Sequence, residues 1–284
     1  MIGILAIGTE ITTGQILNTN SQWLSIELLA LGIQTSYQIA VPDSPHEIKE
    51  ALHFLENRAS IIIVTGGLGP TADDFTRKVL AEKYQLPLVW NEENWVRVQA
   101  KLNAKGVQIR TIHRQQCEFP QDCTILLNNA GVADGFTFKI PRSKASASNI
   151  LSPSNIPSQF HSSSPSHSQS QEMAQSQEIE IFVLPGPPKE IVNIWQNGVR
   201  DQLNKIIPES QKWIQKQWTT KGLPESEVAT LINEALGEAS LKVLYRAHTP
   251  FIDVKLLFQK KEEEINESHG QKITQALGPW LYEQ

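Results

Sequence analysis

One segment decides the fold, and it reads Ile61-Ile62-Ile63-Val64-Thr65-Gly66-Gly67-Leu68-Gly69-Pro70-Thr71-Ala72-Asp73-Asp74. Its first four residues are β-branched and apolar, and such a run predicts a strand buried on both faces in a parallel sheet. The glycines that follow predict a tight turn that a ligand can approach closely, because glycine has no Cβ. Pro70 and Thr71 then predict a helix start, with Thr71 as the N-cap of a helix over residues 75–81.

A strand, a glycine turn and a helix N-terminus in this order predict a phosphate site made of backbone N–H groups. Asp73 and Asp74 place two carboxylates beside it, which favours a divalent cation shared with the phosphate. Neighbouring residues on a helix point about 100° apart, so only one of the two is expected to face the ligand directly. The same pattern also fits an ordinary turn followed by a solvated, acidic helix start.

Further loops are expected at the same edge of the sheet. Strand and helix patterns alternate over residues 2–7, 21–31, 35–41 and 47–58. This alternation predicts an α/β fold with a doubly wound, mostly parallel sheet, in which ligands bind beyond the carboxyl ends of the strands. We therefore expect Gly8, Thr9, Glu10 and Asp43 to share a rim with the glycine turn. In the alternative, Glu10 only caps a turn and Asp43 belongs to an ordinary N-cap region.

The composition divides the chain into two domains. Residues 1–207 are expected to form the larger, catalytic domain, and residues 208–284 a small α+β domain with the element order β-α-β-β-α. Residues 143–177 are dominated by Ser, Gln, Pro and Asn, so we expect a disordered insertion there. This insertion would interrupt a hairpin formed by residues 136–140 and 179–184.

Charge and composition exclude several classes of partner. The 284 residues carry a net charge of −5 at pH 7, which gives no electrostatic reason to expect nucleic-acid binding. The N-terminus lacks the basic region of a signal peptide, and no apolar run approaches the roughly 20 residues that span a bilayer. We therefore expect a cytoplasmic protein that binds neither nucleic acid nor a membrane. Cys117 and Cys123 read as reduced thiols, with a disulfide as the alternative.

A series of short motifs runs in order through the larger domain. The motifs are Gly8-Thr9-Glu10, Gly14-Gln15, Asn18-Thr19-Asn20, Val41-Pro42-Asp43, Gly66-Gly67-Leu68-Gly69-Pro70-Thr71, Asp73-Asp74, Thr76, Arg114, Gln116, Asn128, Gly131 and Leu184-Pro185-Gly186-Pro187-Pro188 with Glu190. In these motifs the chain resembles the competence/damage-inducible protein A (CinA) family, in its N-terminal, molybdopterin-binding-like domain. The tail from Trp213 onward is similar to the small α+β domain of the same family.

The chain departs from the family pattern at several places. It has His113-Arg114-Gln115-Gln116 where the family usually has Asn-Arg-Lys-Gln, and Gly131-Val132-Ala133-Asp134-Gly135 where the family usually has Gly-Thr-Ala-Pro-Gly. A carboxylate at Asp134 would be unfavourable close to a pyrophosphate unless a metal neutralised it. The chain ends at Gln284, without the nicotinamide-nucleotide deamidase domain of many members, so we expect no deamidation of nicotinamide mononucleotide.

The resemblance implies a metal-dependent hydrolase of a nucleotide sugar, an ADP-ribose pyrophosphatase that gives AMP and ribose 5-phosphate. Asp73 and Asp74 would hold Mg²⁺, Co²⁺ or Mn²⁺, and the ion and the backbone amides would stabilise charge on the phosphoryl oxygens. The expected catalytic residues are Glu10, Asp43 and Asp74, with either Glu10 or Asp43 orienting a metal-bound water or accepting its proton. The resemblance also implies a homodimer.

The predicted ligand-binding residues come from the same motifs. They are Gly8, Thr9, Asn18, Gly66, Gly67, Leu68, Gly69, Pro70, Thr71, Arg114, Gly131, Pro185, Gly186, Pro187 and Glu190. Arg114 is expected to clamp a phosphate with its bidentate donors. Pro185-Gly186-Pro187 would wall the site, and Glu190 would contact a ribose or fix the loop.

Two other functions stay open at this point. In the first, the domain is a molybdopterin-binding or adenylylating protein of cofactor biosynthesis, since nothing in the chain separates a pterin pocket from an adenosine pocket. In the second, it is a nucleotide-binding module without catalysis, as the altered loop over residues 131–135 suggests.

Overall fold

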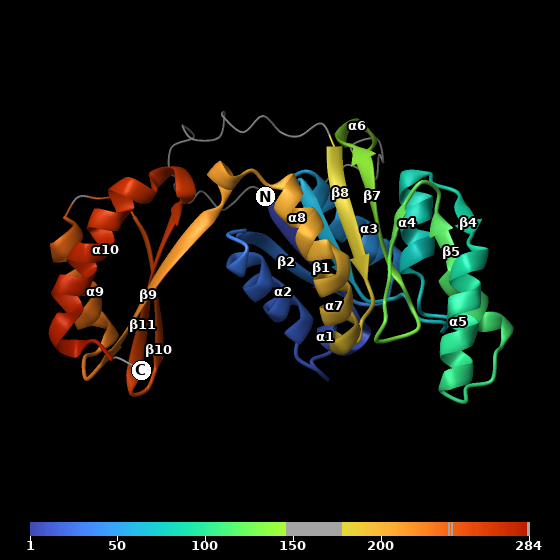
Figure 1. Cartoon of the computed structure of the whole chain (residues 1–284), viewed down its shortest axis with the longest axis horizontal. Coiled ribbons are helices and arrows are strands. Elements are labelled where there is room, and N and C mark those ends of the chain that lie inside the picture. Colours follow the sequence, from blue (N-terminus) through green and yellow to red (C-terminus); the bar gives the residue numbers. More distant parts are fainter. Residues whose placement is uncertain (146–177, 238, 240, 283–284) are drawn as a thin grey trace, which may run out of the picture. The chain divides into compact units, whose positions relative to one another are not determined.

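The structure is a computed structural model of the chain, and it describes residues 1–145, 178–237, 239 and 241–282 (Figure 1). The chain divides into two compact units, one of residues 1–25 and 35–200 and the other of residues 26–34 and 201–284. The predicted insertion over residues 143–177 lies, from residue 146 onward, outside the described residues. Its disorder therefore stays a prediction.

The larger unit is built on a six-stranded sheet with the order β2-β1-β3-β8-β7-β6. The strands are β1 (Ile2–Ile7), β2 (Thr35–Val41), β3 (Ile61–Thr65), β6 (Thr124–Leu126), β7 (Gly135–Pro141) and β8 (Glu178–Leu184). β1 pairs in parallel with β2 and β3, and β3 in parallel with β8, whereas β7 is antiparallel to both β8 and β6. The predicted α/β fold with a mostly parallel sheet is confirmed, and so is the hairpin, which β7 and β8 form.

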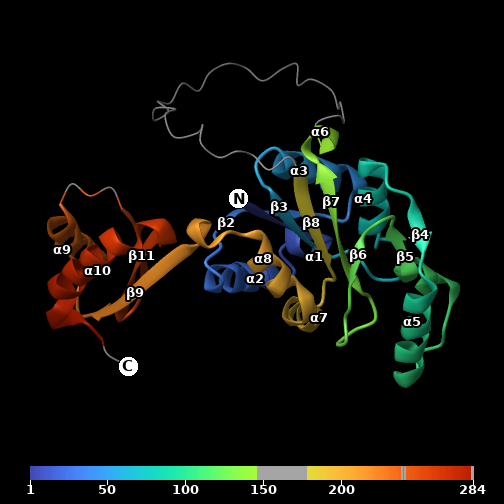
Figure 2. The same ribbon diagram turned by 45° about the horizontal axis from the view of Figure 1, so that its top comes forward.

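Helices cover both faces of this sheet. The helices of this unit are α1 (Thr9–Thr12), α2 (Thr19–Ala30), α3 (Pro45–Glu56), α4 (Thr76–Tyr84), α6 (Arg142–Ala145) and α7 (Pro188–Ile194). A π-helical turn over Trp195–Val199 follows α7 and leads to α8 (Arg200–Ile206). Figure 2 shows α3 and α4 on one face and α7 on the other. Ile48 and Leu52 of α3 and Leu80 of α4 are fully buried against alternate residues of the parallel strands. This core fixes the loops that leave the carboxyl ends of the strands.

The helix after the glycine turn begins later than predicted. α4 starts at Thr76, with Phe75 in the N-cap position, so the prediction of Thr71 as the N-cap is wrong. The reason is a local turn: the Asp74 carboxylate accepts hydrogen bonds from the N–H and the hydroxyl of Thr71. These bonds satisfy Thr71 within the loop, and residues 71–74 stay outside the helix.

A smaller layer packs beside the sheet. β4 (Leu88–Trp90) pairs antiparallel with β5 (Glu118–Pro120), next to α5 (Glu92–Ala104) and the 3₁₀-helix η1 (Thr111–Cys117). Val98, Leu102 and Cys117 form a small buried core between α5 and η1. Both Cys117 and Cys123 are free thiols. Burial raises the pKa of Cys117 to about 12 and that of Cys123 to about 11, so both are unreactive near neutral pH.

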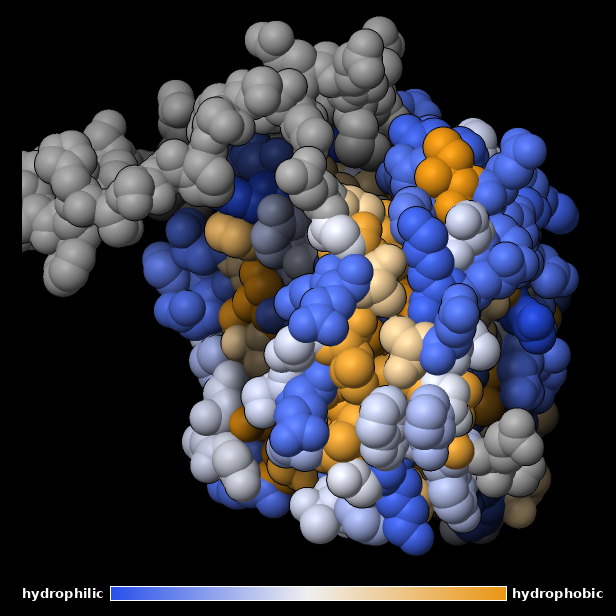
Figure 3. All heavy atoms as spheres, turned by 90° about the vertical axis from the view of Figure 1, so that its left-hand side faces the viewer, coloured by the Kyte–Doolittle hydropathy of each residue, from blue (hydrophilic) through white to orange (hydrophobic). Residues whose placement is uncertain are grey.

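The smaller unit contains a three-stranded antiparallel sheet with the order β10-β11-β9. Its elements are β9 (Trp213–Lys221), α9 (Glu225–Leu236), β10 (Lys242–His248), β11 (Phe251–Gln259) and α10 (Glu263–Leu277), with 3₁₀ turns over Glu209–Gln211, Lys260–Glu262 and Gly278–Trp280. The predicted order β-α-β-β-α is therefore observed. Figure 3 views the side on which α9 and α10 lie in Figure 1, where apolar side chains form a strip between polar ones. In the core of this unit, Val228, Ile232 and Ile273 pack with Val254 and Leu256.

In the part of the chain that the structure describes, no helix has the length and apolar character that crossing a membrane requires.

Candidate functional site

A pocket of about 440 Å³ opens at the carboxyl ends of the parallel strands β1, β3 and β8. It is lined by Ile7, Gly8, Glu10, Asp43, Gly66, Gly67, Leu68, Gly69, Pro70, Asp73, Asp74, Gln116, Val132, Ala133, Pro185, Gly186, Pro187 and Glu190. Loops from distant parts of the sequence thus meet here, as the parallel topology requires. The three predicted catalytic residues Glu10, Asp43 and Asp74 all line this pocket, and their catalytic role stays a prediction.

The glycine turn has a shape that only glycine permits. Gly66 and Gly67 have φ angles of 101° and 66°, which residues with a Cβ rarely adopt. A Cβ at Gly66 would lie 2.2 Å from Ile7 O, and one at Gly67 would lie 2.1 Å from Thr76 Oγ1. The Thr76 hydroxyl donates in turn to Gly66 O at 3.0 Å. The turn is therefore pressed against β1 and the first residue of α4.

The same turn has backbone N–H groups that no described residue accepts from. The N–H of Gly66 donates to Leu184 O at 3.1 Å, which joins β3 to β8. The next three N–H groups, of Gly67, Leu68 and Gly69, donate to no group of the described residues. A row of free amides at the end of a strand can donate hydrogen bonds to an anion.

A buried arginine supports the turn from behind. Arg77 is 4% exposed, and it donates from Nη1 to Leu68 O at 2.9 Å and from Nη2 to Asp134 O at 3.3 Å. Burial lowers the pKa of Arg77 to about 10, so the guanidinium is charged at neutral pH. Both hydrogen-bond partners are carbonyl oxygens, which leaves a positive charge close beneath the free amides.

Of two neighbouring glutamines of η1, one supports the glycine turn and the other lines the pocket. Gln115 Nε2 donates to Gly69 O at 3.1 Å and to Thr71 O at 3.0 Å, and so it braces the glycine turn. Gln116 is 3% exposed and lines the pocket. Its Oε1 is buried without a hydrogen-bond partner in the described part of the chain.

The loops after β1 and β2 hold each other through Thr9 and Asp43. Asp43 Oδ2 accepts hydrogen bonds from Thr9 N at 2.7 Å and from Thr9 Oγ1 at 3.0 Å, and Asp43 N donates to Thr9 Oγ1 at 3.1 Å. Thr9 therefore positions Asp43. The Glu10 carboxylate lies over Gly8, where a Cβ would come 2.8 Å from Glu10 Oε1. Gly8 makes room for a carboxylate at the rim.

The adjacent aspartates differ in their surroundings. Asp74 Oδ2 accepts a hydrogen bond from Thr71 N at 2.9 Å, and its carboxylate packs on Gly69, where a Cβ would come 2.4 Å from it. Asp73 is exposed, and the nearby Thr71 hydroxyl and the backbone N–H of Asp73 itself lower the pKa of its carboxyl. Both precede α4 and both line the pocket, so the expected helical angle between them does not apply.

The pocket carboxylates limit how a metal ion can bind. Among the described residues, no group of three or more His, Cys, Asp or Glu side chains is arranged to hold an ion. Asp43 and Asp74 already accept hydrogen bonds from Thr9 and Thr71. These residues fit Mg²⁺ in its usual mode, through one or two carboxylates together with a phosphate of the ligand. The predicted ion stays a prediction.

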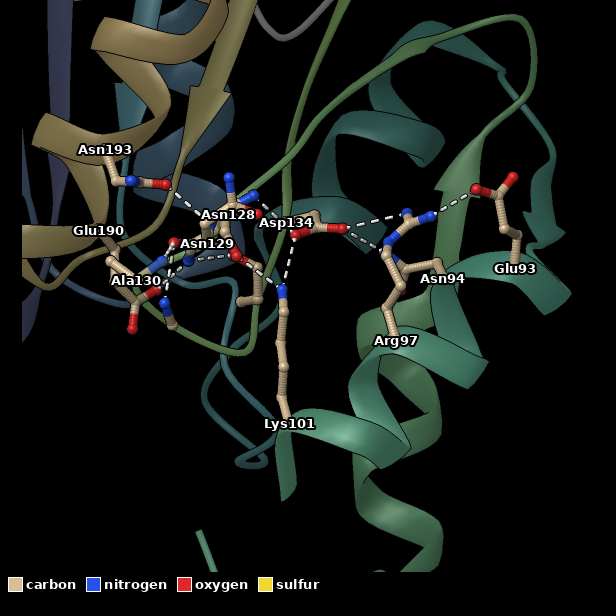
Figure 4. Close-up of polar contacts among 12 residues, drawn as sticks. Glu93, Asn94, Arg97, Lys101, Asn128, Asn129, Ala130, Asp134, Glu190 and Asn193 are labelled. Carbon is tan, nitrogen blue, oxygen red and sulfur yellow. Dashed lines mark hydrogen bonds and ion pairs between the residues drawn. The ribbon is translucent and has the colours of Figure 1, made fainter. Parts of the chain in front are cut away.

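Asn128 organises the wall that carries Glu190 (Figure 4). Its Oδ1 accepts hydrogen bonds from Ala130 N at 3.0 Å and Gly131 N at 2.9 Å, and its Nδ2 donates to Glu190 Oε2 at 2.7 Å. A Cβ at Gly131 would lie 2.0 Å from Glu190 Cδ, so Gly131 gives space to that carboxylate. Burial raises the pKa of Glu190, although the hydrogen bond from Asn128 opposes the shift.

The departure from the family pattern at Asp134 has a structural role. Asp134 is 1% exposed, and its carboxylate accepts from Asn94 Nδ2 at 2.6 Å and from Asn128 N at 2.9 Å. It also pairs with Arg97 at 3.3 Å and Lys101 at 3.4 Å, both on α5 (Figure 4). The side chain therefore does not line the pocket, and the expected repulsion of a pyrophosphate does not arise.

Five predicted ligand-binding residues do not line the pocket: Thr9, Asn18, Thr71, Arg114 and Gly131. Thr9, Thr71 and Gly131 instead support the pocket carboxylates. The Asn18 side chain accepts a hydrogen bond from Ser21 N at 3.1 Å in α2. The Arg114 guanidinium lies 4.2 Å above the Trp90 ring in a cation–π contact, and its role as a phosphate clamp stays a prediction.

Residues 3–205 match the family model described as probable molybdopterin binding domain. The chain belongs to this family. A CinA-like protein of Prochlorococcus marinus is 27% identical over 286 residues, which cover 96% of this chain and 58% of that protein. A CinA-like protein of Cytophaga hutchinsonii is 40% identical over 137 residues, which cover 48% of this chain and 33% of that protein.

The fold of this molybdopterin-binding domain is also found in a solved structure. The protein CinA of unknown function from Thermoplasma acidophilum superposes with a TM-score of 0.53 at 20% identity, over 70% of this chain and 97% of that one. The chain spans about three fifths of the length of the Prochlorococcus relative. The expected lack of a deamidase domain therefore stays a prediction.

The family match overturns the predicted ADP-ribose pyrophosphatase. The matched family is described by the binding of molybdopterin and not by diphosphate hydrolysis. The prediction of a hydrolase that gives AMP and ribose 5-phosphate is wrong, and the alternative of a molybdopterin-binding protein fits the match.

Three residues that support or line the pocket were not predicted as site residues: Arg77, Asn128 and Gln116. Arg77 reads in sequence as an ordinary charged residue of an amphipathic helix. Asn128 and Gln116 belong to the motifs that carry the family resemblance, and this was the one signal that pointed to them. Their roles depend on contacts with segments far away in the sequence.

Proposed function

We propose that the pocket binds a phosphorylated pterin of the molybdopterin class, with its phosphate at the glycine turn. The observation that carries this proposal is the row of free N–H groups at Gly67, Leu68 and Gly69 in a domain of this family. Each amide can donate one hydrogen bond to a phosphate oxygen, and charge-assisted hydrogen bonds of this kind are the stronger ones.

Arg77 supports the phosphate without touching it. Among the described residues that line the pocket, five have carboxylates and none has a lysine or arginine side chain. The buried guanidinium behind Leu68 therefore supplies the nearest fixed positive charge to the turn. In a low-dielectric interior such a charge acts strongly on an anion nearby.

The rest of the pocket suits a flat ring. Val132, Ala133 and the segment Pro185-Gly186-Pro187 provide apolar walls. Asn20 Nδ2 donates to Gly186 O at 2.7 Å, which fixes that segment. A volume of about 440 Å³ falls within the range of small-molecule sites.

The carboxylates favour a second candidate, an enzyme that adenylylates the bound pterin phosphate. Glu10 and Asp73 are positioned at the rim where Mg²⁺ could join a carboxylate to the phosphates of a nucleotide. The chemistry is the transfer of AMP from ATP to an oxygen of the pterin phosphate, with pyrophosphate as the leaving group. When bound, the ion would neutralise charge on the phosphates.

The test is a titration of the purified protein with neopterin phosphate, in which the change in pterin fluorescence measures binding. Arg77→Met should weaken binding about tenfold through loss of the buried charge. The control is Lys78→Met, an exposed lysine of the same helix, which should bind like the wild type. Equal affinity of all three proteins, or no binding by the wild type, would contradict the proposal.

Addition of ATP and Mg²⁺ to the same mixture separates the two candidates. Release of pyrophosphate together with an adenylylated pterin supports the enzyme, and binding without turnover supports a binding module.

The predicted homodimer is also part of the proposal. Light scattering after gel filtration should give twice the mass of one chain.

A further inference from the structure

The pocket contains one buried polar atom that nothing in the described chain satisfies. Gln116 is 3% exposed, lines the pocket, and has its Oε1 without a hydrogen-bond partner among the described residues. A buried amide oxygen without a donor is costly, and native proteins keep few of them. The position in a ligand pocket indicates that the missing donor belongs to the ligand.

The residues of η1 on either side of Gln116 are held in place. The neighbouring Gln115 donates to Gly69 O and Thr71 O, which fastens η1 to the glycine turn. On the other side, Cys117 is fully buried in the core between α5 and η1. Gln116 thus lies between two fixed residues, close to the turn that offers the free amides.

The lining of the pocket cannot supply the donor. Its other polar side chains are the carboxylates of Glu10, Asp43, Asp73, Asp74 and Glu190, which accept hydrogen bonds when ionised. Its free donors are the backbone N–H groups of the glycine turn, which suit an anion. The pocket therefore has donors for an anionic end of a ligand and an acceptor, Gln116 Oε1, for another part.

We infer that Gln116 determines the ligand class by accepting a hydrogen bond from a ring N–H of the bound heterocycle. This inference rests on the proposed function, and it specifies the group of the ligand that the protein recognises. The ring must carry an N–H or amino donor, as a 2-amino-4-oxopteridine does. Methyl phosphate, which has no N–H, amino or hydroxyl group outside its phosphate, lacks that donor and gains nothing from Gln116.

The experiment compares two ligands and three variants. Neopterin phosphate carries both the ring and the phosphate, and methyl phosphate carries the phosphate alone. Gln116→Met removes the acceptor and keeps the length of the side chain, whereas Gln116→Glu keeps an acceptor oxygen. Gln115→Met is the matched control, because that amide braces the glycine turn. Melting temperature without ligand reports the fold of each variant.

Gln116→Met should weaken the binding of neopterin phosphate about tenfold and leave the binding of methyl phosphate unchanged. Its melting temperature should stay equal or rise, since an unpaired buried oxygen is removed. Gln116→Glu should recover part of the pterin affinity, and Gln115→Met should weaken both ligands alike. If the wild type binds neopterin phosphate and Gln116→Met binds it equally well, the inference is overturned and the proposed function stands. If the wild type binds neither ligand, the proposed function falls.

Discussion

Asn94 Nδ2 donates a hydrogen bond of 2.6 Å to Asp134 Oδ2, and this bond ties α5 to the loop that walls the pocket. The same carboxylate pairs with Arg97 and Lys101, one and two helical turns further along α5. Asp134 is almost fully buried, and its carboxylate also accepts from Asn128 N, so it joins both ends of the loop over residues 128–135 to α5. The pocket wall is thus stabilised from outside the pocket.

Asp134→Ala should lower the free energy of unfolding by about 2–4 kcal/mol, because two cations and two amide donors lose their acceptor. Urea unfolding measures the change. The control is Glu93→Ala, which removes an 86% exposed carboxylate paired with the same Arg97 and should cost at most about 0.5 kcal/mol. Equal losses in the two variants would contradict the assigned role of Asp134.

Gly67 and Gly106 form a matched pair for testing the glycine turn. Their φ angles are 66° and 67°, but a Cβ at Gly67 would meet Thr76 Oγ1 at 2.1 Å, and one at Gly106 would meet nothing within 4 Å. Gly106→Ala should therefore cost only the left-handed strain of about 1–2 kcal/mol. Gly67→Ala should cost more and should also abolish the binding of neopterin phosphate. A Gly67→Ala variant with the stability and affinity of Gly106→Ala would refute this reading of the turn.

Glu190 should make stability depend on pH. Burial raises the pKa of its carboxyl above the ordinary value of 4.5, although Asn128 opposes the shift. The protonated form is thus favoured in the folded state, so this contribution is complete below pH 4.5 and is lost as the pH rises through the raised pKa. Glu190→Gln should melt like the wild type at pH 4 and at a higher temperature than the wild type at pH 7. Glu50→Gln, at an exposed position of α3, controls for the change of charge.

Asp73 and Asp74 should separate metal binding from stability. Asp74→Ala should lower the free energy of unfolding by about 1–2 kcal/mol, because Thr71 loses its acceptor. Asp73→Ala, at an exposed carboxylate, should change it by at most about 0.5 kcal/mol. If Asp73 binds a Mg²⁺ ion that also binds the phosphate, Mg²⁺ should raise the affinity of the wild type for neopterin phosphate. The same addition of Mg²⁺ should leave the affinity of Asp73→Ala unchanged. A full Mg²⁺ effect in Asp73→Ala would remove this residue from the metal site.

The parallel sheet was predictable because its signals are local. Four β-branched residues over 61–64 and the glycine turn after them needed no information from elsewhere in the chain, and β3 forms there. Alternation of strands and helices then placed Gly8, Asp43 and the glycine turn at one edge. The pocket contains all three.

The roles of individual side chains were less predictable, because they depend on distant partners. The sequence predicted Thr71 as an N-cap, but the Asp74 carboxylate accepts a hydrogen bond from the Thr71 N–H and keeps Thr71 in the loop. Arg114 looked like a phosphate clamp, but Trp90 lies beneath it after the chain folds β4 against β5. Asp134 was expected to face the ligand, and Arg97 and Lys101, on α5, draw it away. For Arg114 and Asp134 a residue from another segment decides the outcome, whereas Thr71 is decided by Asp74 within the same loop.

The fit of Gly131 against Glu190 also bears on how such sequences diverge. Since any Cβ at position 131 would fall 2.0 Å from the Glu190 carboxyl carbon, mutation of one position constrains the other. A relative that gains alanine at the first position should have a shorter side chain, such as aspartate or serine, at the second. The residue types at positions 131 and 190 should therefore covary among related sequences, because the two residues compete for the same space in the pocket wall.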